Sequence, residues 1–190
     1  MQYRFVRLTY SAVVCFFLTS GALAQSYHKL KVSDFQGIPQ HNGGIIAYTN
    51  TTIGYTYVPS WQKGYYKLDF TIKLEMNKNE SWIDKSRVRS PEMLAEILKH
   101  EQGHYTIAYL EQQELLRTVG RTVFYDDYLT KAKDILRRID AKYKQLNIDY
   151  DDDTNHMLNR EQQRSWDAYF KKQLAFLPPE SEGFTRNNSR

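Results

Sequence analysis

Alternation of apolar and polar side chains is the clearest pattern in the first half of the chain. Between Tyr65 and Met76 apolar residues occupy every second position, which is typical of a strand with one buried face. The preceding segment, Ile45 to Val58, is rich in Ile, Thr, Tyr and Val and is predicted to form a second strand, antiparallel to the first. A turn is expected at residues 59–64, and in the polar loop 77–89 we expect Trp82 to fill the core.

Apolar residues in the second half recur every three or four positions, as on one face of a helix. The run from Ser90 to Gly120 is predicted to be one long helix, because Ser90 and Pro91 are typical of a helix start and Gly120 of a helix stop. Its inward stripe consists of Leu94, Ile97, Leu98, Tyr105, Ala108, Leu115, Leu116 and Val119.

Two shorter helices are predicted after the long one. The first spans about Thr130 to Leu146, an acidic loop follows at residues 149–153, and the second helix begins after Asn159 and ends at Pro178-Pro179. This order of elements predicts an α+β fold, in which an antiparallel sheet is followed by three helices.

The first 24 residues have the pattern of a signal peptide. Arg4 and Arg7 precede the apolar run 12–18, and Ala22-Leu23-Ala24 is a small-residue cleavage site before Gln25. We therefore expect residues 25–179 to form a single exported domain, located in the periplasm or secreted, and residues 180–190 to form a disordered polar tail. No later segment is long and apolar enough to predict a membrane span.

Charge and cysteine content narrow the function classes. Of the 26 Lys and Arg residues two lie in the leader, which leaves 24 against 22 Asp and Glu, so no nucleic-acid partner is predicted. The one cysteine, Cys15, also lies in the leader. The mature chain is thus expected to lack disulfides, and any zinc must be bound by nitrogen and oxygen ligands.

Three ionisable residues interrupt the apolar stripe of the long helix. His100, Glu101 and His104 point where apolar side chains are expected. Burying each of them without a hydrogen-bond or ionic partner would cost roughly several kcal/mol. Two imidazoles four residues apart can bind one Zn²⁺, with Glu101 beside the zinc-bound water as general base. Two hydrogen-bonded core histidines are the alternative.

A catalytic zinc site needs a third protein ligand and an open position for water. Glu111 and Glu114 lie two to three turns beyond His104, too far to bind the same ion. The other candidates are Asp126, Asp127, Asp151, Asp152 and His156. We favour His156, because it is the only histidine after the long helix and a neutral imidazole suits zinc better than an exposed carboxylate.

These residues carry a resemblance to a known family. The chain resembles the bacterial predicted secreted zinc-dependent proteases, domain-of-unknown-function family 922. The segments concerned are Asp34-Phe35-Gln36-Gly37-Ile38-Pro39, Ser81-Trp82, His100-Glu101-Gln102-Gly103-His104-Tyr105, Tyr150-Asp151, Thr154-Asn155-His156, Gln163 and Trp166, so the resemblance covers nearly all of the mature chain. The aspartate usual after the second histidine is Thr106 here, and the glycine usual after the late histidine is Met157. The resemblance implies a peptidase of undefined substrate.

We therefore expect a small zincin-like domain with its metal site on the long helix, acting as a zinc metallopeptidase on a peptide or protein. Glu101 is the expected base, and Tyr150 is a candidate for stabilising the oxyanion, with simple packing as the alternative. Two other functions stay open: an exported, non-catalytic binding module with a structural or vestigial metal site, and a hydrolase of another amide or ester. The sequence predicts no oligomeric state.

Overall fold

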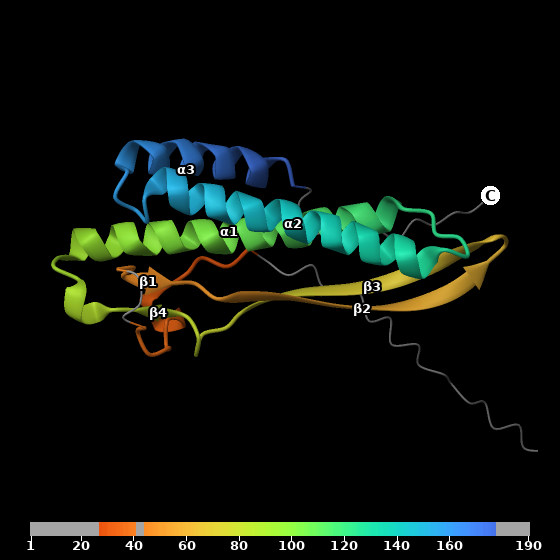
Figure 1. Cartoon of the computed structure of the whole chain (residues 1–190), viewed down its shortest axis with the longest axis horizontal. Coiled ribbons are helices and arrows are strands. Elements are labelled where there is room, and N and C mark those ends of the chain that lie inside the picture. The colour runs from red at the N-terminus through yellow and green to blue at the C-terminus, as the bar shows by residue number, and fades with distance from the viewer. Residues whose placement is uncertain (1–26, 41–43, 178–190) are drawn as a thin grey trace, which may run out of the picture.

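The computed structural model describes residues 27–40 and 44–177. Its elements are η1 (Val32–Asp34), β1 (Ala47–Tyr48), β2 (Thr51–Gln62), β3 (Tyr65–Met76), β4 (Trp82–Ile83), η2 (Lys85–Arg87), α1 (Pro91–Arg121), α2 (Tyr128–Thr154) and α3 (Arg160–Ala175). The fold is α+β, with two small antiparallel sheets followed by three helices (Figure 1). The predicted signal peptide and the predicted C-terminal tail lie outside the described residues.

The predicted first strand is divided into two in the structure. β1 pairs with β4, whereas β2 pairs with β3 from Thr51↔Met76 to Gln62↔Tyr65. The division falls at Thr49 and Asn50. There the Asn50 carbonyl accepts a hydrogen bond from the Asn77 backbone N–H at 2.9 Å, whereas the Asn50 backbone N–H donates to the side chain of Ser81, at 2.9 Å from Oγ. The predicted turn at 59–64 shrinks to its last residues, because β2 pairs with β3 alone among the described strands and such an edge strand tolerates Pro59.

The helix starts follow the predicted capping residues. Ser90 Oγ accepts a hydrogen bond from the backbone N–H of Met93 at 3.2 Å, and Asn159 Oδ1 accepts one from the backbone N–H of Gln162 at 3.2 Å. The end of the second helix was predicted wrongly. The acidic run forms the last turn of α2, which stops at Asn155 because this residue adopts the left-handed conformation that ends many helices.

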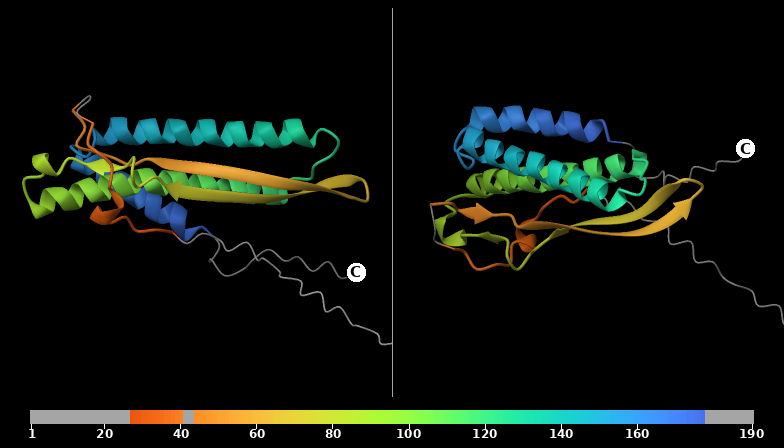
Figure 2. Two further views of the ribbon diagram at one scale, coloured as in Figure 1. Left: turned by 90° about the horizontal axis from the view of Figure 1, so that it is seen from below. Right: turned by 45° about the vertical axis from the view of Figure 1, so that its right-hand side comes forward.

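α1 is the central element of the molecule. It packs against β3 on one side and against α2 and α3 on the other (Figures 1 and 2). One core cluster joins α1, α2, α3 and β3, and a second joins the first half of α1 to β1, β4 and the N-terminal segment. Trp82 is buried at 3% exposure, as predicted. No described helix is long and apolar enough to cross a membrane.

A buried carboxylate fastens the N-terminal segment to the loop after β3. Asp34 lies 2.8 Å from Lys78 Nζ and 2.9 Å from His28 Nε2, and it accepts a hydrogen bond from the Lys31 amide. Burial raises the pKa of Asp34, but the hydrogen bonds from Lys78, His28 and Lys31 outweigh it and lower the pKa to about 2. Leu30 and Phe35 of the same segment pack in the core cluster that contains the first half of α1.

Candidate metal site

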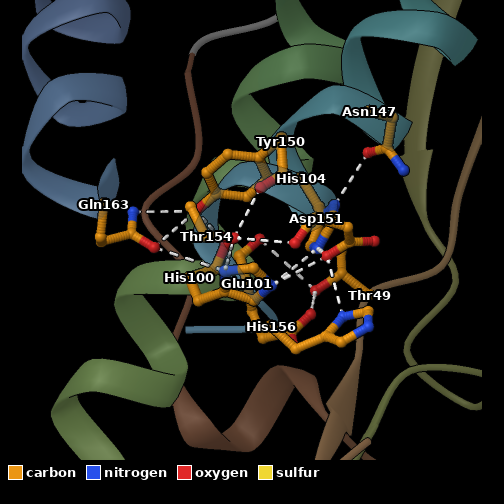
Figure 3. A network of polar contacts seen from close by, with 10 residues as sticks. All are labelled: Thr49, His100, Glu101, His104, Asn147, Tyr150, Asp151, Thr154, His156 and Gln163. Atoms are coloured by element: carbon orange, nitrogen blue, oxygen red, sulfur yellow. Dashed lines mark hydrogen bonds and ion pairs between the residues drawn. The ribbon is translucent and has the colours of Figure 1, made fainter. Parts of the chain in front are cut away.

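Two histidines on α1 and one aspartate on α2 direct their ligand atoms at a common point (Figure 3). His100 and His104 lie one turn apart, and their Nε2 atoms are 3.1 Å from each other. Asp151, near the end of α2, places Oδ1 3.2 Å from both nitrogens. Among the described residues, these three form the group of possible ligands whose donor atoms all lie within 4.8 Å of one another.

The spacing of the three atoms fits a tetrahedral ion. Zinc binds histidine nitrogen and carboxylate oxygen at about 2.0–2.2 Å, so two ligand atoms of a tetrahedral ion lie about 3.3–3.5 Å apart. The observed separations of 3.1 and 3.2 Å are within a few tenths of an ångström of this value. A set of two imidazoles and one carboxylate also suits zinc. The residues present therefore fit the ion.

The second nitrogen of each imidazole is held by a side-chain amide. His100 Nδ1 lies 3.3 Å from Gln163 Oε1 of α3, and His104 Nδ1 lies 2.8 Å from Asn147 Oδ1 of α2. An amide oxygen only accepts hydrogen bonds, so Nδ1 donates its proton in both rings. Nε2, which lies against Asp151, is the nitrogen that would bind a metal after giving up its proton. The other two helices thus fix the orientation and tautomer of the histidines on α1.

Tyr150 lies behind the histidines. It is fully buried, its ring stacks on His100 with centroids 4.8 Å apart, and its hydroxyl donates to the His100 carbonyl at 3.0 Å. Gly103 leaves room for this ring, because a Cβ at that position would lie 2.6 Å from Tyr150 Cε1. The hydroxyl does not line the groove in which an oxyanion would form. The geometry gives Tyr150 the role of positioning His100 in place of the predicted oxyanion contact.

The charges of the cluster depend strongly on one another. Burial by itself lowers the pKa of His104, but the hydrogen bond to Asp151 and the charges of Glu101 and Asp151 raise this pKa to about 9. Burial raises the pKa of Asp151, but the hydrogen bonds from His100 and His104 hold it well below its usual range. The site therefore stabilises a positive charge at the point where the three side chains meet.

Glu101 lies beside the cluster with one carboxylate oxygen engaged. Thr49 Oγ1, in the segment between β1 and β2, donates a hydrogen bond to Glu101 Oε2 at 2.6 Å. No described residue binds the other oxygen, Oε1, and both Glu101 and Thr49 line the groove. The carboxylate is thus held in place by one oxygen while the other can accept a proton.

His156 reaches the edge of the cluster from the turn after α2. Its Nδ1 lies 3.3 Å from Asp151 Oδ1, and its side chain is 55% exposed. Asn155, His156 and Met157 have positive φ angles of 45°, 49° and 81°, which residues other than glycine rarely adopt. Strain of this kind concentrates at functional sites. Asp151 occupies the position opposite the two α1 histidines, where His156 was predicted.

Comparison with known families gives one match. Residues 25–157 match the profile of a family described as bacterial protein of unknown function (DUF922). The chain belongs to this family. No curated protein and no solved structure matches the chain. The part that matches DUF922 contains His100, His104 and Asp151, whereas Gln163, which holds one of the histidines, lies beyond it.

The remaining candidate ligands, and the two glutamates of α1 that were expected to be too far, lie outside the cluster. Asp126 and Asp127 precede α2, at the opposite end of that helix from Asp151. Glu114 binds Lys142 Nζ at 2.5 Å and the Tyr143 hydroxyl at 2.9 Å, and Glu111 lines a distant part of the groove. Asp152 lies on the exposed side of α2. None of them belongs to the group that joins the two histidines in this DUF922 protein.

Two polar residues of the site escaped the sequence analysis. Asn147 is one turn before Asp151, so both lie on the same face of α2. The predicted second helix ended at Leu146, and this spacing was therefore not used. Thr49 carries no signal in the sequence, because a strand rich in Thr gives no reason to single out one hydroxyl. Its contact with Glu101 arises only when the fold brings the β1–β2 segment beside α1.

Proposed function

We propose that this protein is an exported, zinc-dependent metallohydrolase that cleaves peptide bonds. The proposal rests on the spacing of the ligand atoms of His100, His104 and Asp151, which suits a tetrahedral ion. Beside them lies the Glu101 carboxylate, of which only Oε2 accepts a hydrogen bond from a described residue. Bound zinc would supply a Lewis acid that polarises a carbonyl and lowers the pKa of a water molecule to about 7. The resemblance of the motif to zinc-dependent proteases supports the same reaction class.

Glu101 is the residue that moves protons in this mechanism. Thr49 holds Glu101 Oε2, and Glu101 is one of the residues that line the groove. Oε1 accepts a proton from the attacking water, and Glu101 then delivers this proton to the leaving amine. Gln163 and Asn147 keep the histidine rings in place throughout, because both bind the nitrogen that faces away from the cluster.

The shape of the groove supports an extended peptide as substrate. The groove has a volume of about 900 Å³ and crosses the metal cluster. Its wall includes Thr51, Ile53 and Tyr55 of β2, a strand whose second edge pairs with no other described strand. A peptide added along such an edge gains main-chain hydrogen bonds and places its carbonyls near the cluster. This arrangement of a metal-binding helix under an edge strand is the zincin-like feature that we propose.

One observation favours a second candidate, a metal site that only stabilises a binding module. His156 Nδ1 is close enough to Asp151 to become a fourth protein ligand after a small movement, and four protein ligands are typical of structural zinc sites. Replacing His156 by Ala separates the two functions. A structural site should lose zinc affinity by an order of magnitude or more, on the scale of a lost ligand, whereas a site with three ligands should keep its zinc.

The experiment that tests the proposed function compares Glu101→Gln with the unmodified protein. The amide fills the same space but accepts no proton, so hydrolysis of a broad peptide mixture should fall by about two to four orders of magnitude while bound zinc is retained. Glu114→Gln is the matched control, since Glu114 lies on the same helix and does not line the groove. A fully active Glu101→Gln protein would show that another group is the base.

Export is tested by the mass of the mature chain. Protein recovered from the cell envelope or the medium should begin at Gln25, after the predicted cleavage site. Intact Met1 on the recovered protein would contradict export by this leader.

A further inference from the structure

The groove extends much further on one side of the metal cluster than on the other. α1 forms its floor, from Ile97, one turn before His100, to Leu115, three turns after His104. The long side therefore measures about 16 Å along α1 at 1.5 Å per residue. α2 forms the wall of this side and lines it back to Lys133. A substrate would thus make most of its contacts on one side of the cleaved bond.

Glu111 is the acidic residue on the floor of this long side. It follows His104 by seven residues, nearly two full turns, so both side chains lie on the same face of α1. Glu111 is partly buried and lines the groove, but its carboxylate makes no hydrogen bond or ion pair with any described residue. The neighbouring lysines are engaged elsewhere, since Lys144 Nζ lies 2.9 Å from Asp140 and Lys142 Nζ lies 2.5 Å from Glu114.

The surroundings of Glu111 disfavour its negative charge. Burial, followed by the charge of Asp140, raises its pKa to about 7, although the charge of Lys144 acts in the opposite direction. A carboxylate without a partner in a groove is unfavourable for the empty protein. A cation placed in the groove would remove this penalty and gain a charge-assisted hydrogen bond.

We propose that Glu111 is a specificity subsite that binds a lysine or arginine side chain of the substrate. The inference rests on the proposed peptidase function. Glu111 lies about 10 Å from His104 along α1, and an extended peptide advances about 3.3 Å per residue, so the basic residue would be about the third from the cleaved bond. Lys133 and Arg137 line the groove further along α2. The subsite therefore accepts one basic residue and disfavours a run of them.

The first arm of the test measures binding without cleavage. Zinc-loaded Glu101→Gln protein is titrated at about pH 8, where Glu111 is ionised, with fluorescent N-acetylated peptides whose sequence is neutral except for one Lys at a varied position. Acetylation removes the terminal amine as a second source of positive charge. At one position the Lys peptide should bind about tenfold more tightly than its Gln analogue, as for a hydrogen bond between charged groups.

Variants of Glu111 in the same background assign this preference. Glu111→Gln should abolish the ratio between Lys and Gln peptides, and Glu111→Lys should favour an Asp peptide instead. Glu114→Gln should keep the original ratio, because Glu114 is paired and lies outside the groove lining. Equal binding of Lys and Gln peptides at every position, or a ratio that survives in Glu111→Gln, would overturn the assignment.

The second arm measures cleavage by the unmodified protein and identifies the cut bonds by mass spectrometry. We expect the bonds cut fastest to have the basic residue at about the third position on one fixed side. If no peptide is cut although the Lys preference in binding persists, the proposed function fails and the subsite stands. If peptides are cut with no dependence on the basic residue, the function stands and the subsite is refuted.

Discussion

Replacing Gly103 by Ala should destabilise the protein and displace Tyr150, the residue that packs against the metal-site histidine His100. The added methyl group would overlap the Tyr150 ring, 2.6 Å from its Cε1 atom, and Tyr150 has no free space because it is fully buried. Overpacking of this kind costs about 1–3 kcal/mol, and displacing the ring also weakens its hydrogen bonds to the His100 carbonyl and Gln163, at about 1 kcal/mol each. The higher helix propensity of Ala returns about 1 kcal/mol, so the clash prevails by about 2–4 kcal/mol.

Gly120→Ala is the matched control for this prediction. Gly120 also lies in α1, but a Cβ there would meet nothing within 4 Å, so only the propensity gain of up to about 1 kcal/mol remains. Urea denaturation of both variants should show Gly103→Ala to be less stable than the unmodified protein and Gly120→Ala to be equal or more stable. Gly103→Ala should also bind zinc more weakly, since Tyr150 supports His100. A Gly103→Ala protein as stable as Gly120→Ala would refute the packing argument.

Two further predictions concern stability against pH. The pKa of Glu111 is raised from 4.5 to about 7, so ionisation of Glu111 destabilises the folded protein as the pH rises through this range. Glu111→Gln should therefore stabilise the protein by about 2 kcal/mol at pH 8 and should have little effect below pH 4.5. The pKa of Asp34 is lowered from 3.8 to about 2, so the stability that ionised Asp34 contributes is complete above pH 3.8 and is lost as the pH falls through about 2. In urea titrations at neutral pH, Asp34→Asn should lower the free energy of unfolding by about 1 kcal/mol. A pH-independent effect of either variant would contradict the assigned ionisation.

The sequence contained most of the α1 half of the site. The periodic stripe, the capping Ser90 and the spacing of His100 and His104 depend on local rules, and the structure has the helix from Pro91 to Arg121. The partner from α2 was harder to predict. Three adjacent aspartates are typical of a solvated loop, but in the structure they belong to α2 and directly follow the fully buried Tyr150.

The contacts between helices depend on how the turns of α2 and α3 are aligned with those of α1. No local pattern in the sequence predicts this alignment. Gln163 reaches His100 from α3, and Asn147 reaches His104 from α2, each across more than 40 positions of the chain. Which turn of α2 lies beside which turn of α1 follows from the packing of the larger core cluster, in residues such as Ile107, Leu136 and Phe170. For the same reason Asp151 and His156 could not be ranked by spacing alone.

Zinc binding by purified protein tests the central claim most directly. The protein is stripped with a chelator, titrated with zinc in a calorimeter, and compared with His104→Ala and Asp151→Asn. We expect one zinc ion per chain in the unmodified protein and an affinity at least about 100-fold lower in His104→Ala, because one of three ligands is removed. Asp151→Asn should also weaken binding, since the neutral amide replaces the charged ligand that faces both histidines. Absence of zinc binding, or equal affinity in all three proteins, would contradict the account.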